Sequence, residues 1–108
     1  MENFKKRSNR YSNMKTLIID TSSNEEIIVG LRINGQEEIA QQKIDHNQTQ
    51  LILLAINSIL NKNKISVKDL NAIEIQKGKG SLTGIRVGMA IANTFSFLLK
   101  IPVYGKIN

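Results

Sequence analysis

Short apolar runs alternate with polar breaks from residue 15 onward, and their spacing predicts strands. The run 15–20 (KTLIID) ends at a cluster of turn-forming residues, 20–24, which is typical of a buried strand that leads into a polar loop. The segments 25–33 and 36–44 flank Asn34-Gly35, the dipeptide that most strongly favours a two-residue hairpin turn. The start of the apolar pattern therefore predicts three strands in a meander.

Two longer segments repeat their apolar residues at helical spacing. In 48–62 the apolar positions 52, 55, 56, 59 and 60 form one stripe, and Asn47 with Gln50 makes a capping pair in front of it. The segment 84–100 is predicted to form the second helix, which stops before Pro102. Both helices carry more apolar surface than contact with one sheet requires.

The remaining segments complete an alternating pattern. A cap and a short helical turn at 66–69 precede a strand at 71–76, and a strand opened by its proline follows the second helix at 102–107. The predicted order is β-β-β-α-β-α-β. A meander followed by alternating helices and strands implies a mixed sheet with helices packed against it, an α/β fold.

The second predicted helix carries a line of small residues. Gly84, Gly88, Ala92 and Ser96 recur every four residues, and bulky apolar residues cover most of the remaining surface. We therefore expect this helix to be covered on two sides, by the sheet and by a neighbour that the small residues allow to approach closely. The neighbour is either the first helix alone or another protein chain.

Composition limits the chemistry of this chain. Its 108 residues suffice for one domain, and without cysteine it has no disulfide, thiolate nucleophile or zinc–sulfur site, which fits a reducing cytoplasm. The single histidine, His46, excludes a centre with several histidine ligands. The apolar runs are too short for a membrane span, so a membrane partner is not expected.

Half of the net charge of +6 lies in the first thirteen residues, where four basic side chains outnumber one acidic one. This basic segment, 1–13, precedes a second methionine, Met14. It is interpreted as a disordered N-terminal extension or the product of an upstream start codon, or else as an arm that contacts RNA. The domain itself is predicted to span 14–108.

A glycine-rich loop precedes the second helix, where free amides favour an anion. Gly78, Gly80 and Gly84 do not have the spacing of a dinucleotide-binding or P-loop motif, so a tight turn is the default interpretation, with Ser81 or Thr83 as the helix cap. At the end of the first strand, Asp20, Thr21 and Ser22 either bind a magnesium phosphate or hydrogen-bond their own turn. The turn is the favoured interpretation.

Taken together, these segments resemble the N-terminal lobe of the TsaB (YeaZ) family. The resemblance spans about 14–105 and is most specific at 78–88, where GKGSLTGIRVG is similar to the family's Gly-Pro-Gly-Ser-Phe-Thr-Gly-Leu-Arg-Ile-Gly. It implies a single lobe of the actin-like ATPase (RNase H-like) fold and a role in the threonylcarbamoyladenosine modification of tRNA. The second lobe of the family is not found in 14–108.

The resemblance also implies partners and a set of site residues. A TsaB-like protein is expected to be a non-catalytic subunit that docks on the catalytic paralogue TsaD, acts with a TsaE-like ATPase, and also forms a homodimer, all in the cytoplasm. Catalytic residues, metal and cofactor are expected to be absent from this chain, with ATP only at an interface with a partner. The implied interface residues lie on the two helices and are Leu51, Leu54, Ile85, Gly88, Met89, Ala92 and Phe95. The matched loop motif comprises Gly78, Gly80, Ser81, Thr83, Gly84 and Arg86.

The loop departs from the family pattern at two positions. Lys79 replaces a proline and Leu82 a phenylalanine, which makes the loop less rigid and more basic. Contact of Lys79 with a phosphate, together with Asp20, Thr21 and Ser22, therefore stays open. Two alternative functions follow: a small basic module that binds RNA directly, and a homodimer that binds a nucleotide between its copies.

Overall fold

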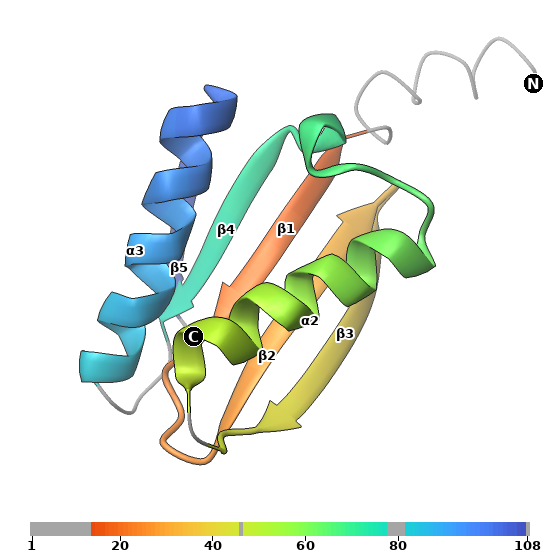
Figure 1. The fold of residues 1–108 in the computed structure, drawn as a ribbon. Coiled ribbons are helices and arrows are strands. Elements are labelled where there is room, and N and C mark those ends of the chain that lie inside the picture. Colours follow the sequence, from red (N-terminus) through yellow and green to blue (C-terminus); the bar gives the residue numbers. More distant parts are fainter. Residues whose placement is uncertain (1–13, 46, 78–81, 108) are drawn as a thin grey trace, which may run out of the picture.

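The computed structural model describes residues 14–45, 47–77 and 82–107, and within these ranges the predicted element order is confirmed (Figure 1). The N-terminal extension, His46 and the loop residues 78–81 lie outside the described residues. The strands are β1 (Lys15–Asp20), β2 (Glu26–Ile33), β3 (Gln36–Lys43), β4 (Ala72–Lys77) and β5 (Val103–Ile107). The helices are α2 (Gln48–Lys62), the short 3₁₀ turn η1 (Val67–Asp69) and α3 (Leu82–Leu99).

The strands form one mixed sheet in the order β3-β2-β1-β4-β5. β2 pairs antiparallel with both β1 and β3, whereas β1–β4 and β4–β5 are parallel pairs. β1 lies in the centre because it is apolar on both faces: Leu17, Ile18 and Ile19 are all fully buried. A mixed α/β sheet is thus confirmed.

Local turn and cap chemistry places the elements as predicted. Asn34 and Gly35 both have positive φ angles, 57° and 76°, as a type I′ hairpin turn requires. The side chain of Asn47 accepts a hydrogen bond from the amide of Gln50 at 3.0 Å, which caps α2. A capping box at Ser66 opens η1.

Both α-helices pack on the same face of the sheet, side by side across it (Figure 1). The core lies between the sheet and these helices, where Leu17 and Ile19 of β1 meet residues of α2 such as Ile52 and residues of α3 such as Ala92. Neither helix among the described residues combines the length and apolarity that a bilayer crossing requires.

The opposite face of the sheet, which we call the open face, carries no helix of the described residues. Here Arg32 of β2 reaches in two directions, to Glu37 of β3 at 2.5 Å and to Glu74 of β4 at 3.1 Å. The hydrogen bonds to Glu74 and Glu37 raise the pKa of Arg32 above its ordinary value of 12.5. Gly30 leaves room on this face for the side chain of Ile39, since a Cβ atom at Gly30 would lie 2.6 Å from the Ile39 Cδ1 atom.

Candidate functional site

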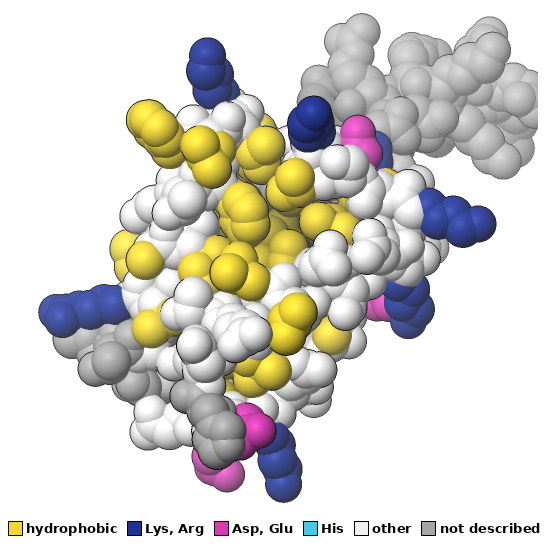
Figure 2. Space-filling model, in the orientation of Figure 1, with side chains coloured by type: hydrophobic (Ala, Val, Ile, Leu, Met, Phe, Trp, Pro, Cys, Tyr) yellow, Lys and Arg dark blue, Asp and Glu magenta, His cyan; other side chains and the backbone are white. Residues whose placement is uncertain are grey.

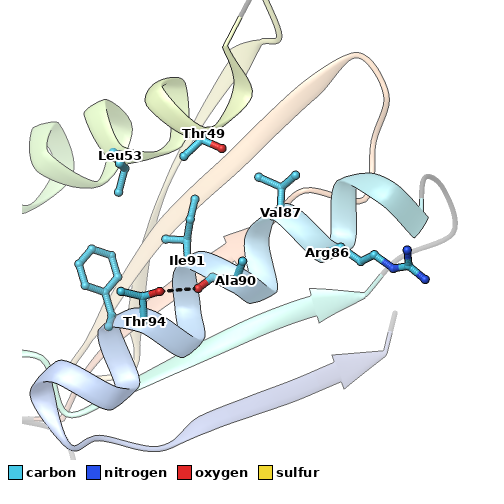
Figure 3. Close-up of a pocket in the computed structure, with 8 residues that line it drawn as sticks. Thr49, Leu53, Arg86, Val87, Ala90, Ile91 and Thr94 are labelled. Carbon is cyan, nitrogen blue, oxygen red and sulfur yellow. Dashed lines mark hydrogen bonds between the residues drawn. The ribbon is translucent and has the colours of Figure 1, made fainter.

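An apolar groove of about 590 Å³ runs between α2 and α3. One wall consists of Thr49 and Leu53 of α2, and in Figure 3 Val87 and Ile91 of α3 point toward that wall. Arg86 is at one end of the groove and its side chain points away from it (Figure 3). The complete lining is Thr49, Leu53, Arg86, Val87, Ala90, Ile91, Thr94 and Phe95.

The polar groups of the groove offer little to a polar ligand. The Thr94 hydroxyl donates a hydrogen bond to the main-chain carbonyl of Ala90 at 2.9 Å, so it is satisfied within its own helix (Figure 3). Leu53 is 43% exposed although it is a large apolar side chain. The groove is therefore better suited to apolar side chains of another protein than to a charged small molecule.

Exposed apolar side chains continue beyond the groove on both helices. Phe97 and Leu98 near the end of α3 are 81% and 67% exposed, and Leu54 of α2 is 56% exposed. Figure 2 shows hydrophobic side chains gathered over this helical face of the molecule. A contiguous apolar surface of this kind is typical of an interaction site.

The structure separates the predicted interface residues into different environments. Leu54 and Met89 are exposed, whereas Leu51, Ile85 and Phe95 are half-buried. Among them Phe95 lines the groove. Met89 instead lies with Val103 and Tyr104 at a smaller cavity of about 240 Å³ beside β5. The predicted residues thus do not form one patch.

The prediction that Gly88 and Ala92 face a partner is wrong. Both are buried, and a Cβ atom at Gly88 would lie 2.5 Å from Thr21 Oγ1 and 3.2 Å from Ile19 Cγ2. The line of small residues therefore faces β1, so that α3 can approach the sheet closely. The neighbour that this line accommodates is the sheet, not a second helix or chain.

Leu53, Ala90 and Thr94 line the groove and were not predicted. Thr49 and Leu53 are four residues apart in α2, and Ala90 and Thr94 are four apart in α3, so each pair lies on one flank of its helix. That spacing is visible in the sequence. What the sequence does not show is which flank of each helix faces the other.

The turn after β1 is hydrogen-bonded as predicted. Asp20 Oδ1 accepts hydrogen bonds from the amide of Ser22 at 3.0 Å and from its hydroxyl at 2.6 Å. The Thr21 hydroxyl donates to the main-chain carbonyl of Gly84 in the first turn of α3. These contacts occupy the groups that were considered for phosphate binding. Binding of a phosphate there stays a prediction, because Lys79 lies outside the described residues.

The rest of the loop motif is only partly described. Gly78, Gly80 and Ser81 lie outside the described residues, and α3 already includes Thr83, so Thr83 does not occupy the cap position. Gly84 is buried and Arg86 is exposed. Within the described ranges, no three His, Cys, Asp or Glu side chains are close enough to hold a metal ion together.

Comparison with known proteins gives consistent results for sequence and fold. The family described as "TsaD: tRNA N6-adenosine threonylcarbamoyltransferase" matches residues 34–106. The chain is similar to the tRNA threonylcarbamoyladenosine biosynthesis protein TsaB of Escherichia coli, with 33% identity over 85% of this chain. It is also similar to the TsaB protein of Bacillus subtilis, with 31% identity over 83% of this chain.

The solved structure of YeaZ from Pseudomonas aeruginosa shares the fold, with a TM-score of 0.79 over 88% of this chain at 24% identity. The chain spans 39% of the length of each of the two TsaB relatives and 44% of the YeaZ chain. The expected single lobe of the actin-like (RNase H-like) fold is thereby confirmed.

Proposed function

The chain belongs to the TsaB (YeaZ) family, and on this premise we propose that it is a subunit of the machinery that makes threonylcarbamoyladenosine in tRNA. We further propose that it performs no chemistry itself and docks on a TsaD-type catalytic subunit in the cytoplasm. The names of the relatives support the pathway. The apolar groove between α2 and α3 supports the docking role.

The groove is the observation that carries this proposal. Leu53 and Phe95 give it apolar walls, and Ile91, only 9% exposed, lies at its base. A helix of the partner that inserts apolar side chains between α2 and α3 would remove this surface from water and extend the helical layer. Arg86 at the end of the groove would then lie at the rim, where a charge contributes to orientation more than to affinity.

The test is light scattering after size exclusion, with the chain alone and with a TsaD subunit from the same organism. A stable complex is expected with the unaltered chain. Leu53→Glu would place a carboxylate on the wall of the groove and is expected to weaken the complex by at least about a hundredfold. Ser58→Glu is the matched control, because it adds the same charge at an exposed position of α2 that does not line the groove.

Circular dichroism of each variant separates loss of binding from loss of folding. Leu53 is 43% exposed, so Leu53→Glu is expected to keep the helical signal of the unaltered chain. The proposal is wrong if the unaltered chain ignores the TsaD subunit. A folded Leu53→Glu variant that binds as well as Ser58→Glu would instead remove the groove from the docking surface.

The proposal assigns nucleotide chemistry to the partner. We expect titration calorimetry to show no heat of ATP binding for this chain alone, and binding only after the TsaD subunit, with or without a TsaE-like ATPase, is added. Binding of ATP by the isolated chain that Asp20→Ala abolishes would contradict this assignment and favour a nucleotide site at the turn after β1.

A further inference from the structure

The strand β3 leaves one edge of the sheet without a neighbour among the described residues (Figure 1). Its eight residues pair with β2 in an unbroken register from Ile33↔Gln36 to Glu26↔Lys43. The edge thus has neither a bulge nor a proline to interrupt it, and these are two of the features by which proteins prevent edge strands from pairing with another chain. A regular edge of this length can accept a further strand.

The outward-facing backbone groups of β3 follow from the hairpin turn. In a two-residue loop the flanking residues, here Ile33 and Gln36, form a hydrogen-bonded pair, and the direction of the amides then alternates along the strand. The amide of Ile44 donates to the carbonyl of Glu25 at 2.9 Å, which continues the same alternation toward β2. The odd-numbered residues Glu37 to Lys43 therefore direct their amide and carbonyl groups away from β2.

Opposite charges lie near the two ends of this edge. Glu37 and Lys43 are both exposed and, with Ile39, on the open face. Arg32 donates both of its hydrogen bonds to Oε2 of Glu37, at 2.5 and 2.8 Å, which leaves Oε1 without a partner among the described residues. Lys43 likewise makes no ion pair within the described part of the chain. An antiparallel copy of the same strand would bring each charge to its opposite.

We propose that two copies of this chain pair through β3, antiparallel, about a two-fold axis that passes by Ala40. The two sheets then form one continuous sheet with both helical layers on the same side. Glu37 of each copy lies opposite Lys43 of the other, and Ile39 lies opposite Gln41 of the other. Because all these residues direct their backbone groups outward, each opposed pair is a hydrogen-bonded pair.

Charge selects this register over its neighbours. A two-fold axis normal to the sheet keeps the faces aligned, so only shifts that preserve the alternation of side chains are allowed. Centring the axis on Glu38 places two Glu38 carboxylates opposite each other, and centring it on Gln41 places Glu37 opposite Asp45. Centring it on Ile39 places Glu37 opposite the uncharged Gln41. Like charges directly opposite destabilise a pair of strands, whereas opposite charges stabilise it.

This pairing does not depend on the groove. The groove is formed by α2 and α3, whereas β3 is the outermost strand of the sheet. Leu53→Glu should therefore leave the pairing of two copies unchanged, even if it abolishes docking. Failure of one proposal is thus distinguishable from failure of the other.

The first test is sedimentation equilibrium of the full chain over a range of concentrations, where a monomer–dimer equilibrium is expected. Gln41→Pro removes one outward amide from each copy at an edge position, where proline is compatible with the sheet. We expect it to raise the dimer dissociation constant by at least about tenfold. Gln41→Ala keeps the amide and is the matched control. A chain that stays monomeric at all concentrations would refute the proposal.

The second test exchanges the charges. Lys43→Glu opposes two carboxylates across the axis, and Glu37→Lys opposes two ammonium groups, so each variant alone should dimerise at least about tenfold more weakly. In an equimolar mixture one copy of each restores both ion pairs, and heterodimers should form with nearly the original affinity. Homodimers that persist in both variants, or a mixture of folded variants that stays monomeric, would contradict the assigned register.

Discussion

The Thr21 hydroxyl donates a hydrogen bond to the main-chain carbonyl oxygen of Gly84 at 2.5 Å, in a buried position and across 63 residues of sequence. This bond joins the end of β1 to the first turn of α3, the helix that forms one wall of the groove. The position of that wall is therefore fixed from the centre of the sheet.

We expect Thr21→Val to destabilise the fold by about 1–3 kcal/mol, because it leaves a buried carbonyl without this donor while it conserves the shape of the side chain. Urea denaturation followed by circular dichroism measures the change. Thr94→Val is the control, since the Thr94 hydroxyl is exposed and bonds only to its own helix. Equal effects of the two substitutions would show that the buried bond contributes nothing special.

Gly88→Ala tests the close approach of α3 to β1. Alanine favours a helix over glycine by about 1 kcal/mol, but the added Cβ atom would lie 2.5 Å from Thr21 Oγ1. We expect a net destabilisation of about 1–3 kcal/mol from this overlap. In a Thr21→Ala background the overlapping atom is gone, so Gly88→Ala should cost less there. A double-mutant cycle in urea with no coupling between the two sites would contradict this packing.

The pKa of Glu38 is lowered below its ordinary value of 4.5, first by a hydrogen bond from Lys62 and then by one from Asn63. A lowered pKa in the folded state means that Glu38 contributes stability above pH 4.5, and that this contribution is lost as the pH falls through the lowered value. Lys62→Gln should raise the pKa of Glu38 in an NMR titration. Lys64→Gln removes a nearby exposed lysine and should leave it unchanged.

The two flanks of α3 are distinguishable by charge substitution. Met89→Glu adds a carboxylate beside β5, at a residue that is 36% exposed, so the monomer should stay folded. If docking uses the groove alone, Met89→Glu should weaken the TsaD complex by less than about tenfold, against at least about a hundredfold for Leu53→Glu. Titration of both variants with the TsaD subunit measures this. The reverse order of effects would move the docking surface to the flank predicted from the sequence.

The strands and helices follow from local sequence, because apolar periodicity and turn residues act over a few positions. Asn34-Gly35 determines the hairpin and Asn47 the start of α2, and both are as predicted. The start of α3 was predicted two residues too late, since Gly84 was assigned to the loop. Its carbonyl instead accepts the hydrogen bond of Thr21, a contact between distant segments that no local pattern reveals.

The candidate site was predicted less well than the fold, for a physical reason. Periodicity gives the angular position of a residue around its helix, but not the element that each flank faces. Gly88 and Ala92 were assigned to a partner because small residues allow close packing, and the close neighbour is β1. The exposed Leu53 could not be distinguished from Leu54 and Leu51 until α3 was placed beside it.

The central position of β1 also orders the folding of this chain in time. β2 and β3 can pair with β1 as soon as the meander has been synthesised, but the other edge of β1 pairs with β4, where Thr16 lies opposite Ala72. Closing that loop is entropically slow compared with forming the hairpin. Until β4 arrives, Leu17, Ile18 and Ile19 lie on an unpaired edge. The meander alone is thus an aggregation-prone intermediate, and any fragment that ends before β4 should require a chaperone.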